Sequence, residues 1–254
     1  MCLIALAWRV HPAYPLVVAA NRDEFHRRPA DPLHWWTDQP NIAGGRDQLA
    51  GGTWLGVSRN GRFATVTNYR ENLRVQAGAR SRGSLVTGFL SDSSAPLAHL
   101  SAIEGNSFAG FNLLTAVPDA LAYRSNRGDA PRILPPGIYG LSNASLDAPW
   151  WKVERSKWRL RALLDNNAVS VPALFELLAD REPANAPDVS DDVLPPDTAR
   201  AVSAPFIVTA EYGTRCSTVM LQDVSGNIAL HERRFDAAGR ASGESALDFK
   251  MDVD

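Results

Sequence analysis

The sequence predicts an α+β domain in which stacked antiparallel β-sheets lie between layers of helices. Apolar runs of strand length occur near both ends of the chain, helical patterns separate them, and turn signals join neighbouring strands into hairpins. Hairpins imply antiparallel pairing, and sheets that are apolar on both faces need helices to cover them. The pattern of elements alone is also compatible with another α+β layering.

The size and composition of the chain are those of a globular protein. Its 254 residues are enough to bury a large core, with 45% hydrophobic and 21% charged residues. We predict a single domain over residues 1–235. A loose C-terminal tail is expected over residues 236–254.

The charge pattern and the cysteine count indicate a cytoplasmic protein. A formal net charge of -2 with no long basic run argues against nucleic acid as a partner. No apolar stretch approaches the roughly 20 residues of a membrane-spanning helix, and the apolar start lacks the flanks of a secretory signal. With only Cys2 and Cys216, the chain is expected in a reducing compartment.

Two hairpins are predicted in the first 70 residues. Cys2–Trp8 and Leu16–Ala20 are apolar runs separated by prolines, which break the backbone between them. Thr53–Ser58 and Phe63–Tyr69 are joined by a turn in which Asn60-Gly61 supplies the positive φ angles. Both pairs should be antiparallel.

The rest of the chain alternates between helix and strand signals. One or two short helices are predicted within residues 82–103, interrupted at Pro96, and the longest helix within residues 150–164. Residues 183–205 form a predicted surface excursion, rich in Pro, Asp and Ala. The remaining predicted strands are Phe111–Val117, Leu121–Arg124, Phe206–Thr209, Thr214–Gln222 and Ile228–Phe235.

Cys2 directly follows the initiator Met, and its small side chain permits removal of that Met. A free α-amino group titrates near pH ~8 and can accept the thiol proton without a partner histidine. The resulting thiolate is able to attack an amide or ester carbonyl. The structural alternative is that Cys2 is only a small apolar residue at the start of a buried strand.

Four polar residues, Asn21, Arg22, Asp23 and Glu24, stand at the exit of the second apolar run. Strand alternation places Asn21 and Asp23 on one face and Arg22 and Glu24 on the other, so only one pair easily faces Cys2. Asp23 would orient an amino terminus, and Arg22 would lower a thiol pKa or bind a carboxylate. The four residues are equally compatible with a structural ion-pair network.

Seven short blocks follow one another in order along the chain. They are Met1-Cys2, Asn21-Arg-Asp-Glu24, Gly51-Gly-Thr-Trp-Leu-Gly56, Thr67-Asn-Tyr-Arg70, Phe111-Asn-Leu-Leu114, Gly140-Leu-Ser-Asn143 and Gly213-Thr-Arg215. Together they closely resemble the NRDE family, also called the transport and Golgi organization protein 2 family, from Met1 to about Phe235. That family is in turn similar to cysteine N-terminal-nucleophile hydrolases such as penicillin V acylase and bile salt hydrolase. The resemblance implies their four-layer αββα sandwich.

The same resemblance implies a set of site residues. Cys2 would be the nucleophile, Arg22 and Asp23 its supporting pair, and Arg215 a later active-site arginine. Asn68 or Asn143 would donate to the oxyanion. This chain departs from the hydrolases in one respect. Their supporting Arg and Asp stand three residues apart, whereas Arg22 and Asp23 are adjacent and face opposite ways in an extended strand. Asn143 is also compatible with a turn or capping role, and Asn68 with a polar strand end.

Two functions follow from these observations. The first is a thiol hydrolase that cleaves a small amide or ester and requires no cofactor. The second is a non-catalytic protein that binds and transports haem, which the resemblance to a family linked to haem mobilisation implies, with Cys2 or a histidine as axial ligand. The spacing of the five histidines predicts no metal site. Cys2 separates the two functions, because only hydrolysis needs its thiol and its free amine together.

Overall fold

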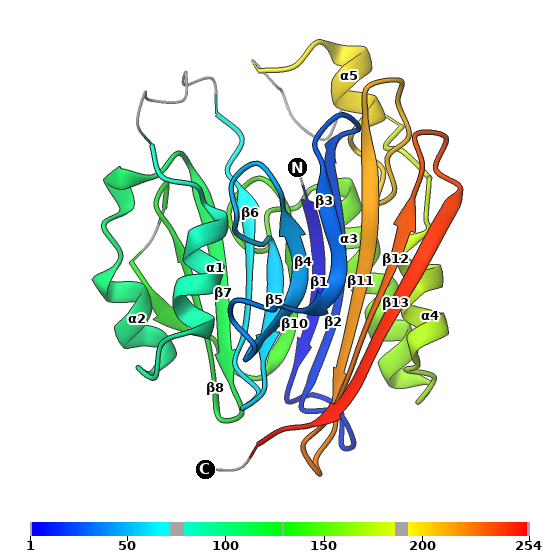
Figure 1. Cartoon of the computed structure of the whole chain (residues 1–254). Helices are drawn as coiled ribbons and strands as arrows, with labels where there is room; N and C mark the ends of the chain where they lie inside the picture. The colour runs from blue at the N-terminus through cyan, green and yellow to red at the C-terminus, as the bar shows by residue number, and fades with distance from the viewer. Residues whose placement is uncertain (1, 72–78, 129, 186–192, 253–254) are drawn as a thin grey trace.

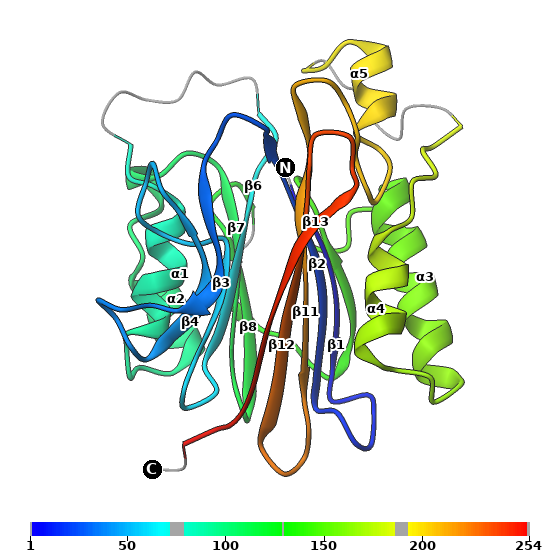
Figure 2. The same cartoon turned by 45° about the vertical axis from the view of Figure 1, so that its right-hand side comes forward.

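The computed structural model describes residues 2–71, 79–128, 130–185 and 193–252. Two antiparallel sheets lie face to face, and each is covered on its outer side by helices (Figures 1 and 2). The predicted α+β class and the four-layer αββα sandwich are therefore confirmed.

The first sheet contains six strands in the order β10-β1-β2-β11-β12-β13. Its N-terminal strand is thus an inner strand of the sheet. Every neighbouring pair is antiparallel. The strands are β1 (Cys2–Trp8), β2 (Leu16–Phe25), β10 (Gly137–Leu141), β11 (Tyr212–Gln222), β12 (Asn227–Phe235) and β13 (Ala241–Lys250).

The second sheet contains seven strands in sequential order from β3 to β9. Sequential order means that each strand pairs with the next one along the chain, as in a meander. The strands are β3 (Ala30–Trp35), β4 (Ile42–Asp47), β5 (Leu55–Ser58), β6 (Phe63–Asn68), β7 (Phe111–Val117), β8 (Ala120–Ser125) and β9 (Arg132–Ile133).

Helices cover the outer face of each sheet. On the second sheet lie α1 (Gly83–Leu90) and α2 (Pro96–Ala102), with the short 3-10 helix Gly105–Ser107 after them, and on the first lie α3 (Trp151–Asp165) and α4 (Val171–Leu178). A further helix, α5, spans Pro196–Ala201. The predicted break at Pro96 and the predicted longest helix are both confirmed, because α3 is the longest helix of the described residues.

Side-chain alternation along β1 explains why this strand is apolar throughout. Ile4, Leu6 and Trp8 point between the two sheets, whereas Ala5 and Ala7 face α3 and α4. Because both faces of the strand are covered, neither face carries polar residues. The small alanines allow the helices to approach closely, and the larger residues fill the gap between the sheets.

The second predicted hairpin is present with a different turn. Among the described residues of its loop only Gly61 has a positive φ, at 77°, so Asn60 does not adopt the predicted left-handed conformation. The Gly61 N–H donates to the Ser58 carbonyl, and the Ser58 N–H donates to the Arg62 carbonyl. This is the three-residue hairpin loop that ends with a bulge, and it needs one left-handed residue.

Two further predictions for the C-terminal part of the chain are wrong. The described residues after Asp236, 237–252, are not a loose tail, because β13 pairs with β12 along its length. Phe206–Thr209 forms no strand and contributes only the isolated bridge between Val208 and Gly213. The predicted surface excursion over 183–205 contains α5, and its residues 186–192 lie outside the described residues. No helix within the described ranges has the length and apolarity needed to cross a membrane.

Candidate functional site

A cavity of about 130 Å³ opens where the start of β1 and the end of β2 meet the second sheet and the start of α1. Most of the residues around it are polar or charged. They are Cys2, Arg22, Asp23, Glu24, Arg28, Asp47, Gly52, Thr53, Trp54, Val66, Asn68, Ser81, Arg82 and Gly83. Four of the six predicted site residues are therefore brought together here.

Cys2 and Arg22 are cross-strand neighbours. They lie opposite each other in the β1–β2 register, so their side chains project from the same face of the first sheet. That face is the one turned towards the second sheet, because Ile4 and Leu6, which follow Cys2 at intervals of two residues along β1, point into the core between the sheets. The Ser142 hydroxyl donates to the Cys2 carbonyl at 2.8 Å and fixes the start of the strand from its other side.

The surroundings of Cys2 have opposing effects on the pKa of its thiol. Burial raises the pKa of the Cys2 thiol, and the negative charge of Asp23 raises it further. The Asp23 backbone amide and the Arg22 charge lower the pKa, but they do not outweigh burial. The thiol is therefore mainly protonated at neutral pH, and a nucleophilic role requires a base close to it.

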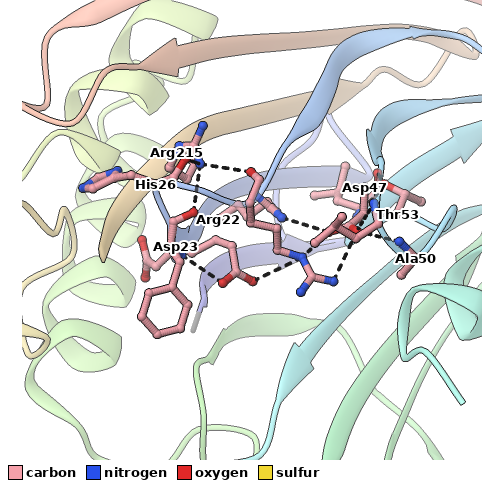
Figure 3. Close-up of polar contacts among 12 residues, drawn as sticks. Arg22, Asp23, His26, Asp47, Ala50, Thr53 and Arg215 are labelled. Carbon is pink, nitrogen blue, oxygen red and sulfur yellow. Dashed lines mark hydrogen bonds and ion pairs between the residues drawn. The ribbon is translucent and has the colours of Figure 1, made fainter. Parts of the chain in front are cut away.

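Arg22 is held by two residues, Asp47 on β4 and Trp54 just before β5. Its guanidinium lies 3.2 Å from the Asp47 carboxylate and 4.3 Å from the ring centroid of Trp54. Arg28 approaches the same carboxylate at 2.6 Å, so Asp47 bridges two arginines (Figure 3). Although burial raises the Asp47 pKa, the hydrogen bonds from Arg28 and Ala50 leave it lowered overall. This network ties β2 to β4 beside the cavity.

Asp23 is buried on the helix side of β2. Thr214 donates its hydroxyl to the Asp23 carboxylate at 2.7 Å. Burial raises the Asp23 pKa, and the charge of Lys152 on α3 opposes this effect. A bulge in β11 at Arg215 brings Thr214 opposite Asp23 while Cys216 stays opposite Arg22. Because the bulge adds one residue, Thr214 projects towards the same side as Asp23.

Asn21 lies outside the cavity lining and holds the helix layer on the sheet. Its amide group donates to the carbonyls of Leu178 and Pro205, both at 2.9 Å, and its oxygen accepts from Ser217 at 2.6 Å. The predicted alternation is confirmed, with Asn21 on the helix side and Arg22 between the sheets. Within residues 21–24, Asn21 therefore stabilises the packing of the helix layer, whereas the other three residues line the cavity.

Asn21→Ala should lower the free energy of unfolding by about 2–3 kcal/mol, because it leaves two buried carbonyls and a buried hydroxyl without their partner. Urea unfolding followed by tryptophan fluorescence measures this. Asn166→Ala removes an exposed amide that bonds to Ala162, and it should leave the midpoint nearly unchanged. Equal midpoints for the two variants would contradict the scaffold role.

Asn68 and Asn143 are in contact but occupy different positions. Asn68 lines the cavity at the end of β6, whereas Asn143 is absent from the lining. The Asn143 amide donates to the Asn68 carbonyl at 2.7 Å, and its own carbonyl accepts from the Arg70 N–H. The N-cap position of α3 is Trp150, so Asn143 does not cap that helix. Asn143 thus positions the strand that carries Asn68.

Arg215 points away from Cys2. Its guanidinium donates to the backbone carbonyls of Phe25, His26 and Arg28, and it is absent from the cavity lining. Figure 3 shows Arg215 beside His26, at the far side of Arg22 from Asp47. The contacts of Arg215 therefore shape the loop that places Arg28 at the cavity.

Several residues of this cavity could not be predicted from the sequence. Asp47, Arg28 and Arg82 contribute charge to it, and none belongs to a local pattern that predicts a site. The described part of the chain contains no group of three or more His, Cys, Asp or Glu side chains placed to hold a metal ion.

Comparison with known proteins agrees with this geometry. The chain matches the family described as Transport and Golgi organisation 2 over residues 1–237. It is 36% identical to the Transport and Golgi organization protein 2 homologs of Bos taurus and Homo sapiens, in each case over 92% of both chains. Among solved structures, the C2A mutant of a conjugated bile acid hydrolase from Clostridium perfringens is similar, with a TM-score of 0.57 and 7% identity over 98% of this chain and 92% of that chain. The chain has the N-terminal-nucleophile hydrolase fold and belongs to the Transport and Golgi organisation 2 family.

Proposed function

We propose that the protein is an N-terminal-nucleophile cysteine hydrolase that cleaves a carbon–nitrogen amide bond or an ester bond. The observation that carries this proposal is the position of Cys2. It stands at the first position of β1, lines the cavity, and lies opposite Arg22 with Asp23 and Asn68 close by. The shared fold with a conjugated bile acid hydrolase supports the same chemistry.

The reaction needs Met1 to be removed, which leaves Cys2 with a free α-amino group. The amine takes the thiol proton, the thiolate sulfur bonds to the substrate carbonyl carbon, and the carbonyl oxygen becomes an oxyanion. Asn68, which lines the cavity, would donate to that oxyanion. The tetrahedral intermediate then breaks its bond to the amine or alcohol, which leaves with the proton from the α-ammonium. A water molecule, deprotonated by the α-amine, cleaves the thioester and regenerates the thiol.

Arg22 and Asp23 would have separate roles in this mechanism. Arg22 lies on the Cys2 face of the sheet and stabilises the thiolate by its charge. Asp23 lies on the helix side and, through its backbone amide, donates to the Cys2 sulfur. Both residues therefore act on the same sulfur, Arg22 through its side chain and Asp23 through its backbone.

Haem binding is the competing function, and the cavity supports it less well. Sites that enclose a ligand of drug size or larger usually measure about 300–1,000 Å³, whereas this cavity holds about 130 Å³. None of the five histidines is among the described residues that line it. A cavity of this size holds the reacting carbonyl of a substrate and its neighbouring atoms, with the rest of the substrate outside.

The intact mass of the untagged protein, before and after limiting iodoacetamide at neutral pH, tests the proposal. We expect loss of Met1 and fast single labelling that Cys2→Ala removes and Cys216→Ala does not. Burial raises the pKa of the Cys216 thiol well above its ordinary value, so Cys216 should label slowly. Retained Met1 with a Cys2 that labels slowly at pH 7, and faster only as pH rises, would reject this mechanism. Haem titration would be the next measurement in that case.

A further inference from the structure

The cavity wall opposite Arg22 carries a third arginine, Arg82, which is the residue immediately before α1. Its guanidinium is partly buried and donates to the Gly110 carbonyl at 3.2 Å. Arg82 lines the cavity together with Cys2, and the charge of each group acts on the other. A guanidinium in this position presents its remaining N–H groups to whatever enters the cavity.

The carboxylates near Arg82 are engaged elsewhere. Asp47 lies against Arg22 and Arg28, and Glu71 forms an ion pair with Arg127 at 2.6 Å. The Glu24 carboxylate accepts from the Phe25 N–H and faces Arg28. Within the residues that the structure describes, no carboxylate forms an ion pair with Arg82.

Among the charged residues that line the cavity, Arg82 is therefore the guanidinium that no described carboxylate neutralises by an ion pair. Arg22 and Arg28 both lie against Asp47, and Arg28 also faces Glu24. The third acidic residue of the lining, Asp23, accepts a hydrogen bond from Thr214. Since arginine stays protonated in proteins, the charge of Arg82 persists at all physiological pH values.

We propose that Arg82 binds an anionic oxygen group of the substrate, a carboxylate or a phosphate, placed within a few ångströms of the bond that Cys2 attacks. This inference rests on the proposed function, and it narrows the substrate class to amides or esters that carry such a group beside the scissile carbonyl. Guanidinium groups pair with carboxylate and phosphate oxygens in two-point contacts. The small volume of the cavity keeps the anion and the reacting carbonyl close together.

Iodoacetate and iodoacetamide give a direct test, because they alkylate the same thiol and differ mainly in the charge of the group beside the reacting carbon. The rate of each reagent at Cys2 is measured by mass spectrometry on the Cys216→Ala protein after Met1 removal. The ratio of the two rates is divided by the ratio for a free Cys-Leu-Ile peptide. We expect the protein to favour iodoacetate by about fivefold or more relative to the peptide.

Arg82→Gln should lower that preference by about fivefold, and Arg82→Lys should retain most of it. Arg80→Gln is the matched control, since Arg80 is absent from the cavity lining and stacks on Phe108, with 5.0 Å from its guanidinium carbon to the ring centroid. Thermal melting identifies any variant that fails to fold. Should Arg82→Gln fail to fold, protection of Cys2 against iodoacetamide by acetate or inorganic phosphate, compared between the unaltered chain and Arg82→Met, replaces it.

The outcomes separate this inference from the hydrolase proposal. Protection by acetate alone identifies a carboxylate site, and protection by phosphate alone identifies a phosphate site. Equal rate ratios in the protein, its Arg82 variants and the peptide, with no protection by either anion, would overturn the inference even if neutral amides are hydrolysed. An Arg82-dependent ratio in a protein that hydrolyses nothing would keep the anion site and remove the hydrolase.

Discussion

Cys2→Ala should abolish hydrolysis of amides and esters while the protein remains folded. Loss of the nucleophile removes the covalent step, and in proteases of similar logic this lowers kcat by a factor on the order of 10⁴–10⁶. The melting temperature should change by only a few degrees, because the substitution removes a single sulfur atom at the first position of β1. Turnover is measured on a panel of short N-acyl amides and p-nitrophenyl esters, with and without a carboxylate beside the scissile bond.

A variant with one glycine inserted between Met1 and Cys2 is the sharper control for this prediction. It keeps the Cys2 thiol but moves the free α-amine to another residue, so it should be as inactive as Cys2→Ala. Cys216→Ala should retain full activity. Turnover in the glycine-insertion variant would show that the thiol works without its own amine, and the proposed proton transfer would then be wrong.

Asp47→Ala should lower the free energy of unfolding by about 3 kcal/mol, because it leaves the buried Arg22 guanidinium without its carboxylate. In a chain of this length that corresponds to a fall in Tm of about 6–12 °C. Cys2 labelling should also slow, since Arg22 is then free to move away from the sulfur. Calorimetry and the iodoacetamide rate measure the two effects on the same sample.

Asp38→Ala is the matched control for the Asp47 prediction. It removes an exposed carboxylate in the loop between β3 and β4, which pairs with Arg46 at 2.6 Å. Exposed pairs contribute little to stability, so Tm and the labelling rate should both stay near those of the unaltered chain. A Tm after Asp47→Ala as high as that after Asp38→Ala would show that the two sheets do not depend on the bridge.

Strands with strong apolar runs could be predicted from the sequence, whereas several others could not. β1 and β2 are buried on both faces, so their composition identifies them. β4 contains two glycines, and a Cβ at Gly45 would lie 2.4 Å from the Trp54 ring that covers Arg22. Close packing therefore removes the side chains that signal a strand. β13 is a half-exposed edge strand, and its polar composition led to the prediction of a loose tail.

The residues of the candidate site that lie on one strand could be predicted from the sequence, whereas Asp47 and Arg82, which other elements bring to the site, could not. The alternation within residues 21–24 is a property of one strand, so sequence alone separates Arg22 from Asn21. Asp47 and Arg82 come from a different sheet and from the start of a helix, and pairing of this kind depends on how the two sheets stack. Arg215 matched the family pattern, but it lies at a bulge in β11, and its guanidinium donates to backbone carbonyls outside the cavity lining.

The inner position of β1 has a consequence for how the protein is made. Cys2 is the first residue of β1. The neighbouring strand β2 pairs with β1 along one edge and with β11 along the other, so Arg22 lies between Cys2 and Cys216 in the sheet. Cys216 comes 214 positions after Cys2 in the sequence. At about 5–20 residues per second, a ribosome needs roughly 10–40 s to cover that interval. Once the start of the chain has left the ribosome, the sheet that buries it is still incomplete until β11 has been made. The proposed removal of Met1 would therefore have a window during translation, because β11, which pairs with β2 beside Cys2, is among the last elements to be synthesised.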